Sequence, residues 1–85
     1  MVETFEETAP SVPELTDYDR AHIKLYMRLL DATAEGAPWQ EVVALLFGID
    51  PAREPERGRR VHDSHLARAQ WVAAGGYKDL LRQPH

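Results

Sequence analysis

The chain has 85 residues, carries a formal net charge of −4 and contains no cysteine. This length predicts one small domain, and the lack of cysteine excludes a disulfide scaffold, thiolate metal sites and a cysteine nucleophile. No apolar run approaches the roughly 18 residues that span a bilayer and the acidic N-terminus lacks the basic start of a signal peptide, so we expect a cytoplasmic protein without a membrane segment.

The charge is distributed unevenly along the chain. Residues 1–19 contain six acidic residues and no Lys or Arg, whereas residues 20–85 carry a net charge of +2. Residues 1–15 are also rich in Glu, Thr and Pro and have few large apolar side chains, so we predict a disordered acidic tail. Such a tail either only aids solubility or shields a basic face of the folded domain, which we place at residues 16–82.

The first helix is predicted from about residue 17 to residue 35, with Thr16 as its N-cap and Gly36 as its end. Its apolar side chains form two stripes at helical spacing. One stripe contains Ile23, Met27, Leu30 and Ala34, and the other contains Tyr18, His22, Leu25 and Leu29. Together they are wider than the apolar face of an ordinary surface helix. The helix is therefore either central in the fold or leaves the second stripe as a candidate surface for a protein partner.

Two further helices and a closing turn complete the predicted fold. A short helix covers residues 38–47, and a long helix covers residues 55–74 and stops at a Gly-Gly pair. Residues 77–83 form the closing turn. No segment alternates convincingly with a period of two, so the predicted fold is all-α, a small domain of three to four helices.

The long third helix separates a core face from an arginine-rich face. Val61, His65 and Ala69 lie on the core face. The opposite face and its edge contain six candidate contact residues: Arg57, Arg59, Arg60, Ser64, Arg68 and Trp71. Arginines in the N-terminal half of a helix suit phosphates and guanine edges in the major groove, although acidic residues among them would repel phosphate. A solvated face, a nucleic-acid face and a protein-binding face are all compatible with this pattern.

The sequence contains no convincing catalytic or metal-binding constellation. Three histidines, His22, His62 and His65, are candidates for one metal site, but they lie on or beside the core faces, where a hydrogen-bonded core histidine is the favoured interpretation. Ser64 stands between two of them, yet neighbours on a helix point apart and form no nucleophile–base pair. We therefore expect no metal, no cofactor and no enzymatic activity. Trp71 either anchors a protein partner beside the arginines or packs on the closing turn.

Four stretches of the chain resemble a known family. They are LTDYDRAHIKLYMRLLDA, WQEVVALLFGIDP, RRVHDSHLARA and GGYKDLL, and together they resemble the proteobacterial helix-turn-helix variant domain that RovC-type and FseA-type transcription activators share. The resemblance implies that residues 39–47 and 57–69 form the two helices of the motif. It places DNA contacts at Arg57, Arg59, Arg60 and Arg68. The connection GIDPAREPE departs from a tight helix-turn-helix, whose turn has three or four residues.

The chain differs from those activators because an acidic tail, rather than a larger protein, accompanies the domain. In this respect it is similar to the stand-alone QseM-type antiactivators, which bind transcription activators and block them. The resemblance implies a monomeric antiactivator whose partners are LuxR-type quorum-sensing regulators or FseA-like activators of conjugative transfer. The alternative is a sequence-specific DNA-binding transcription factor that uses the arginine-rich helix. Because the chain is acidic overall, we expect its DNA binding to be weak.

Overall fold

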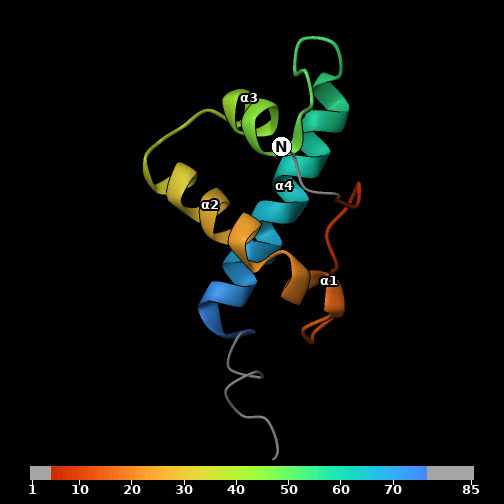
Figure 1. The fold of residues 1–85 in the computed structure, drawn as a ribbon, viewed down its shortest axis with the longest axis vertical. Coiled ribbons are helices and arrows are strands. Elements are labelled where there is room, and N and C mark those ends of the chain that lie inside the picture. The colour runs from red at the N-terminus through yellow and green to blue at the C-terminus, as the bar shows by residue number, and fades with distance from the viewer. Residues whose placement is uncertain (1–4, 77–85) are drawn as a thin grey trace, which may run out of the picture.

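The computed structural model describes residues 5–76, and every regular element in that range is a helix (Figure 1). In chain order the elements are α1 (Asp17–Ala21), α2 (Ile23–Ala34), α3 (Trp39–Val42), the π-helical turn η1 (Val43–Phe47), α4 (Pro55–Trp71) and the π-helical turn η2 (Val72–Gly76). The predicted all-α fold is confirmed. None of the described helices is long and apolar enough to cross a membrane. The predicted closing turn, 77–83, lies outside the described residues.

The predicted first helix begins as expected but is broken in two. Thr16 caps α1 in a capping box, in which its hydroxyl accepts from the Asp19 backbone and the Asp19 carboxylate accepts from the Thr16 backbone. The break falls at His22, where φ is −118° and ψ is 20°. The His22 ring donates to the Tyr18 carbonyl at 2.7 Å, and the His22 backbone N–H bonds to the Asp19 carbonyl instead. The side chain thus takes the carbonyl that a continuous helix would use at this point.

Helix α4 lies at the centre of the fold and packs on α2 and α3. One group of buried apolar side chains joins these helices with η1: Leu25, Leu29, Val42, Val43, Phe47, Ile49 and Val61. A second group lies beside the C-terminal half of α4: Leu15, Tyr26, Ala69 and Val72. The predicted core face of the third helix, with Val61, His65 and Ala69, is buried as expected.

The burial of α2 corrects the prediction of a docking stripe. Leu25 and Leu29, which we placed on the candidate partner surface, are 2% and 0% exposed and belong to the core. Met27, from the other stripe, is 60% exposed. Ile23 and Leu30 of that other stripe are also partly buried, against the second core group. The helix is therefore central in the fold, which is the other alternative that its wide apolar face left open.

A glycine allows α4 to approach α3 and η1 closely. A Cβ atom at Gly58 would lie 3.3 Å from Trp39 Cζ3 and 3.4 Å from Val43 Cγ2, so the backbone of α4 rests directly on these side chains. Before α4, η1 ends at Gly48, which adopts the left-handed conformation with φ of 67°. The connection over residues 49–54 then leads to Pro55 at the start of α4.

The N-terminal segment, for which we expected disorder through residue 15, runs along α4 over its described residues 5–16 (Figure 1). Ala9 and Leu15 are 5% and 8% exposed. The Ala9 backbone donates to Ser64 Oγ at 3.1 Å, and the Phe5 ring meets the Phe47 ring edge-on at 5.0 Å between centroids. The segment therefore covers part of the helix face that carries the candidate contact residues.

Candidate interface on helix α4

Arg68 is buried and serves the fold rather than a surface. It is 5% exposed, and its Nε and Nη2 atoms donate to the two carboxylate oxygens of Asp19 at 3.0 and 2.6 Å. It also donates to the carbonyls of Val12 and Glu14, both at 2.6 Å. The Trp71 ring packs against this guanidinium group, with the Cζ atom 4.0 Å from the ring centroid. Arg68, which we had placed among the DNA contacts, therefore pins the N-terminal segment to α4.

Asp19 is the centre of this buried network. Its carboxylate is 0% exposed and accepts hydrogen bonds from the Thr16 backbone, the Thr16 hydroxyl, the Tyr26 hydroxyl and Arg68. Burial alone would raise the pKa of Asp19, but the hydrogen bonds from Arg68, Thr16 and Tyr26 outweigh it and lower the pKa to about 2. The carboxylate is thus ionised at neutral pH and fully paired.

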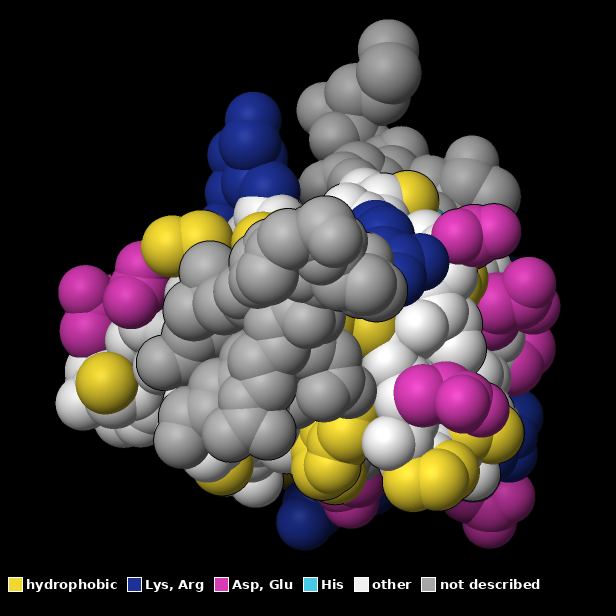
Figure 2. Space-filling view, turned by 90° about the horizontal axis from the view of Figure 1, so that it is seen from below, with side chains coloured by type: hydrophobic (Ala, Val, Ile, Leu, Met, Phe, Trp, Pro, Cys, Tyr) yellow, Lys and Arg dark blue, Asp and Glu magenta, His cyan; other side chains and the backbone are white. Residues whose placement is uncertain are grey.

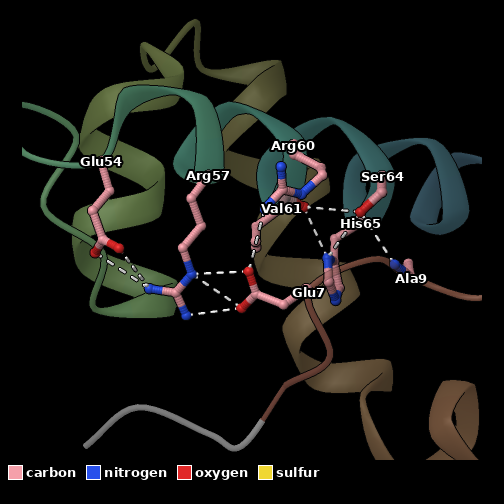
Figure 3. A network of polar contacts seen from close by, with 8 residues as sticks. All are labelled: Glu7, Ala9, Glu54, Arg57, Arg60, Val61, Ser64 and His65. Carbon is pink, nitrogen blue, oxygen red and sulfur yellow. Dashed lines mark hydrogen bonds and ion pairs between the residues drawn. The ribbon is translucent and has the colours of Figure 1, made fainter.

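Arg57 and Arg60 face the N-terminal segment and share one carboxylate (Figure 3). Glu7 accepts from Arg57 Nε at 2.9 Å and from Arg57 Nη2 at 2.8 Å, and Arg60 Nη2 lies 3.5 Å from the same carboxylate. Glu54 adds a further ion pair to Arg57 at 3.3 Å. The hydrogen bond from Arg57, more than any other contact, lowers the pKa of Glu7. Ser64 lies on the same side and holds the segment through Ala9.

Arg59 lies at the edge of this face and has a partner on its own helix. Its Nε donates to Asp63 at 3.0 Å, and its guanidinium group stands 5.4 Å from the Trp39 ring centroid. The side chains of Arg59 and Arg60 are 58% and 55% exposed. All four arginines expected at DNA therefore have a carboxylate partner, although two of them remain largely open to solvent.

Among the side chains of the lower face that Figure 2 leaves uncovered, the basic ones do not gather into one patch. Figure 2 shows this face, where dark blue Lys and Arg side chains stand in separate small groups among magenta acidic ones and yellow hydrophobic ones.

A groove of about 250 Å³ lies between α2 and η1. Ala32, Val42 and Leu46 line it, with Leu45 exposed by 70%. Its charged lining residues are Arg28, Asp31, Glu35 and Glu41.

Tyr18 and His22 are half-buried rather than open to a partner. Their rings stack with 4.0 Å between centroids, and the Tyr18 hydroxyl donates to His65 Nε2 at 2.7 Å while it accepts from the Glu6 backbone at 2.9 Å. His65 donates its other ring N–H to the Val61 carbonyl, and desolvation lowers the pKa of His65. Among the described residues no three His, Asp or Glu side chains are arranged to hold a metal ion.

A comparison with known protein families identifies the family of the chain. A family model described as the T6SS transcription factor DNA-binding domain of RovC type matches residues 3–82. The chain belongs to the RovC DNA-binding domain family. No curated protein matches the chain. The family is one of transcription factor DNA-binding domains rather than of enzymes, so this RovC-type domain is a component of transcription regulation.

Sequence reasoning missed the residues that control the arginine face of this RovC-type domain. Glu7 and Asp19 were counted only among the six acidic residues of positions 1–19, and the alternative that the tail shields a basic face named no residue pair. Their partners, Arg57 and Arg68, stand 50 and 49 positions further along the chain. The one available signal was the position of Asp19 three residues after Thr16, a spacing that suits a capping box but carries no information about the ion pair with Arg68.

Proposed function

We propose that this RovC-type domain is an antiactivator, a cytoplasmic transcription regulator that acts as a monomer by binding activators rather than promoter DNA. The observation that supports this most is the pairing of all four candidate DNA contacts with carboxylates of the same chain. Arg68 is paired with Asp19 at 2.6 Å and Arg57 with Glu7 at 2.8 Å, and Arg59 and Arg60 each have an acidic partner within 3.5 Å.

This pairing opposes DNA binding in two ways. Affinity for DNA comes largely from Lys and Arg side chains that neutralise phosphates and release counterions, and a guanidinium group that already holds a carboxylate must first lose it. The net charge of −4 also repels a polyanion at long range. The partners that fit the proposal are the LuxR-type quorum-sensing regulators and the FseA-like activators of conjugative transfer.

The groove between α2 and η1 is the surface that we assign to the activator. Leu45 lines this groove and is 70% exposed. A contiguous apolar surface that is rimmed by charged residues, as this groove is, marks a protein contact more often than a single exposed side chain does. In Figure 1, α2 and α3 lie on the left of α4, whereas the N-terminal segment lies on its right. We therefore assign the partner contact to this groove instead of to the stripe with Leu25 and Leu29, which is buried in the core.

A binding titration of purified variants with candidate activators tests the assignment. Leu45→Asp should weaken the complex by about thirty-fold or more, the usual cost of losing a central anchor at about 2 kcal/mol. Met27→Asp is the matched control, because Met27 is also an exposed apolar residue, at 60%, but does not line this groove. Normal binding by Leu45→Asp, or a loss confined to Met27→Asp, would place the contact elsewhere.

A sequence-specific DNA-binding transcription factor is the second candidate function. Two observations favour it: the family is one of DNA-binding domains, and the Arg59 and Arg60 side chains are 58% and 55% exposed in the N-terminal half of α4. Helices that enter the major groove commonly contact bases from that half. Saturable, sequence-selective binding of duplex DNA by the intact chain would favour this candidate over the antiactivator.

A further inference from the structure

The Glu7 carboxylate occupies the position of an anionic ligand between two arginines. Its two oxygens accept from both the Nε and the Nη2 atoms of Arg57, and Arg60 approaches the same group at 3.5 Å (Figure 3). A guanidinium fork that grips two oxygens of one anion is also the arrangement by which arginine binds a phosphate group. The carboxylate thus occupies a place where the two arginines are also suited to bind a phosphate group.

The segment that carries Glu7 is anchored on both sides of it. Before Glu7, the Phe5 ring packs on Phe47 at 5.0 Å. After Glu7, Ala9 is bonded to Ser64, and Arg68 grips the carbonyls of Val12 and Glu14. The contacts of Phe5 and Ala9 hold the stretch around Glu7 on α4 while the ion pair is formed, and the Arg68 contacts hold the segment that follows it.

The ion pair itself is exposed, in contrast to its anchors. The side chains of Arg57 and Glu7 are 36% and 49% exposed, so salt and competing anions reach the pair. The Arg68–Asp19 pair, at 4% and 0% exposure, is closed to them. The segment is therefore held firmly at Arg68, whereas at Glu7 another anion can replace the carboxylate in the ion pair.

We propose that residues 5–9 act as an internal competitor for DNA, in which the Glu7 carboxylate occupies the place of a backbone phosphate at a site formed by Arg57 and Arg60. The site is closed while Glu7 is bound and opens when that short stretch lifts from α4. The Arg68 anchor stays in place throughout. The proposal goes beyond the antiactivator function. Both use the pairing of Arg57 with Glu7, but this proposal is tested by the DNA binding of variants, whereas the antiactivator function is tested by the binding of activators to the groove between α2 and η1.

A salt titration with a short, fluorescein-labelled duplex of arbitrary sequence tests the proposal. Removing the competitor in Glu7→Gln should add one phosphate contact, which steepens the slope of log affinity against log salt by about 0.9 between roughly 50 and 200 mM salt. The slope of Glu7→Gln should therefore be steeper than that of the intact chain by about 0.9. Adding Arg57→Gln and Arg60→Gln to Glu7→Gln should return the slope to that of the intact chain.

Glu6→Gln is the matched control because it removes the same charge one residue away. The Glu6 side chain is exposed, and its recorded contact is through its backbone N–H. If Glu6→Gln and Glu7→Gln steepen the slope equally, only net charge matters and the proposal is wrong. It is also wrong if Glu7→Gln gains no DNA binding at the lowest salt. The Arg57 Nε–H resonance, recorded by NMR without DNA, should shift in Glu7→Gln and stay in place in Glu6→Gln, and an unchanged resonance in both would refute the contact itself.

Discussion

Replacing Asp19 by asparagine should destabilise the domain more than any exposed charge substitution. The change keeps the shape of the side chain but turns one carboxylate oxygen into an N–H₂ group. Both oxygens of Asp19 accept hydrogen bonds, and the donors are Thr16, Tyr26 and Arg68. The N–H₂ group of asparagine cannot accept a hydrogen bond, so it would face the N–H or O–H group of one of these donors. Arg68 would lose its counter-charge while it remains 5% exposed.

The expected cost is about 3–5 kcal/mol, the usual result of removing one partner of a buried ion pair. A domain of 85 residues has a total stability of about 4–13 kcal/mol at the usual values per residue. Asp19→Asn should therefore remove a large part of the free energy of unfolding at pH 7. The assay is denaturant unfolding followed by circular dichroism. Asp17→Asn is the control, because the Asp17 side chain is fully exposed in its pair with Arg20.

The stability cost of Asp19→Asn should depend on pH. The pKa of Asp19 falls from 3.8 to about 2 in the folded state, which corresponds to roughly 2–3 kcal/mol of stability. Because the folded pKa is the lower one, this stability is present above pH 3.8 and is lost as the pH falls toward 2. The gap between wild type and Asp19→Asn should shrink by about 1 kcal/mol by pH 3. A gap that stays constant from pH 7 to pH 3, or a cost at pH 7 below about 1 kcal/mol, would refute the buried pair.

Three further predictions concern the core. Leu29→Ala should cost about 2–5 kcal/mol in denaturant unfolding, because Leu29 is 0% exposed, whereas Met27→Ala, at a site 60% exposed, should stay within about 0.5 kcal/mol; equal effects would contradict the assignment of the α2 faces. Tyr18→Phe should cost about 1–3 kcal/mol, because it leaves the buried Nε2 atom of His65 without its 2.7 Å donor, and an unchanged melting temperature would argue against that bond. The ring of His65 should titrate below pH 6.5 in an NMR titration, since desolvation lowers its pKa, and folding stability should fall as the pH drops below 6.5, because the unfolded chain binds the proton more readily; a midpoint above 6.5 would mean that the ring is not buried.

The boundaries of the helices were predictable because their causes are local. Thr16 begins α1 and Gly48 ends η1 through contacts with residues only a few positions away. The break at His22 has an equally short cause, a bond from its ring to the Tyr18 carbonyl. Nothing in the apolar spacing signals this bond, because the spacing continues through His22 as if the helix did.

The pairing of the candidate arginines with carboxylates was less predictable than the helix boundaries. The pattern placed Arg57, Arg60 and Arg68 on one side of the third helix, and the structure agrees. Their pairing depends on Glu7 and Asp19, which stand 50 and 49 positions from Arg57 and Arg68, more than half the length of the chain. Composition also suggested that the acidic segment lacks the apolar side chains to fold, whereas much of its attachment is through backbone groups that Arg68 and Ser64 bind.

The most direct test of the antiactivator proposal is a fluorescence-anisotropy titration of the intact chain. It compares duplexes that carry the promoters of the candidate target genes with a scrambled duplex at physiological salt, beside a titration with the activators themselves. We expect no sequence-selective DNA binding, because all four candidate arginines are paired with carboxylates, and saturable binding of an activator. A nanomolar complex with one promoter and not with the scrambled duplex would contradict the proposal and establish the domain as a DNA-binding regulator.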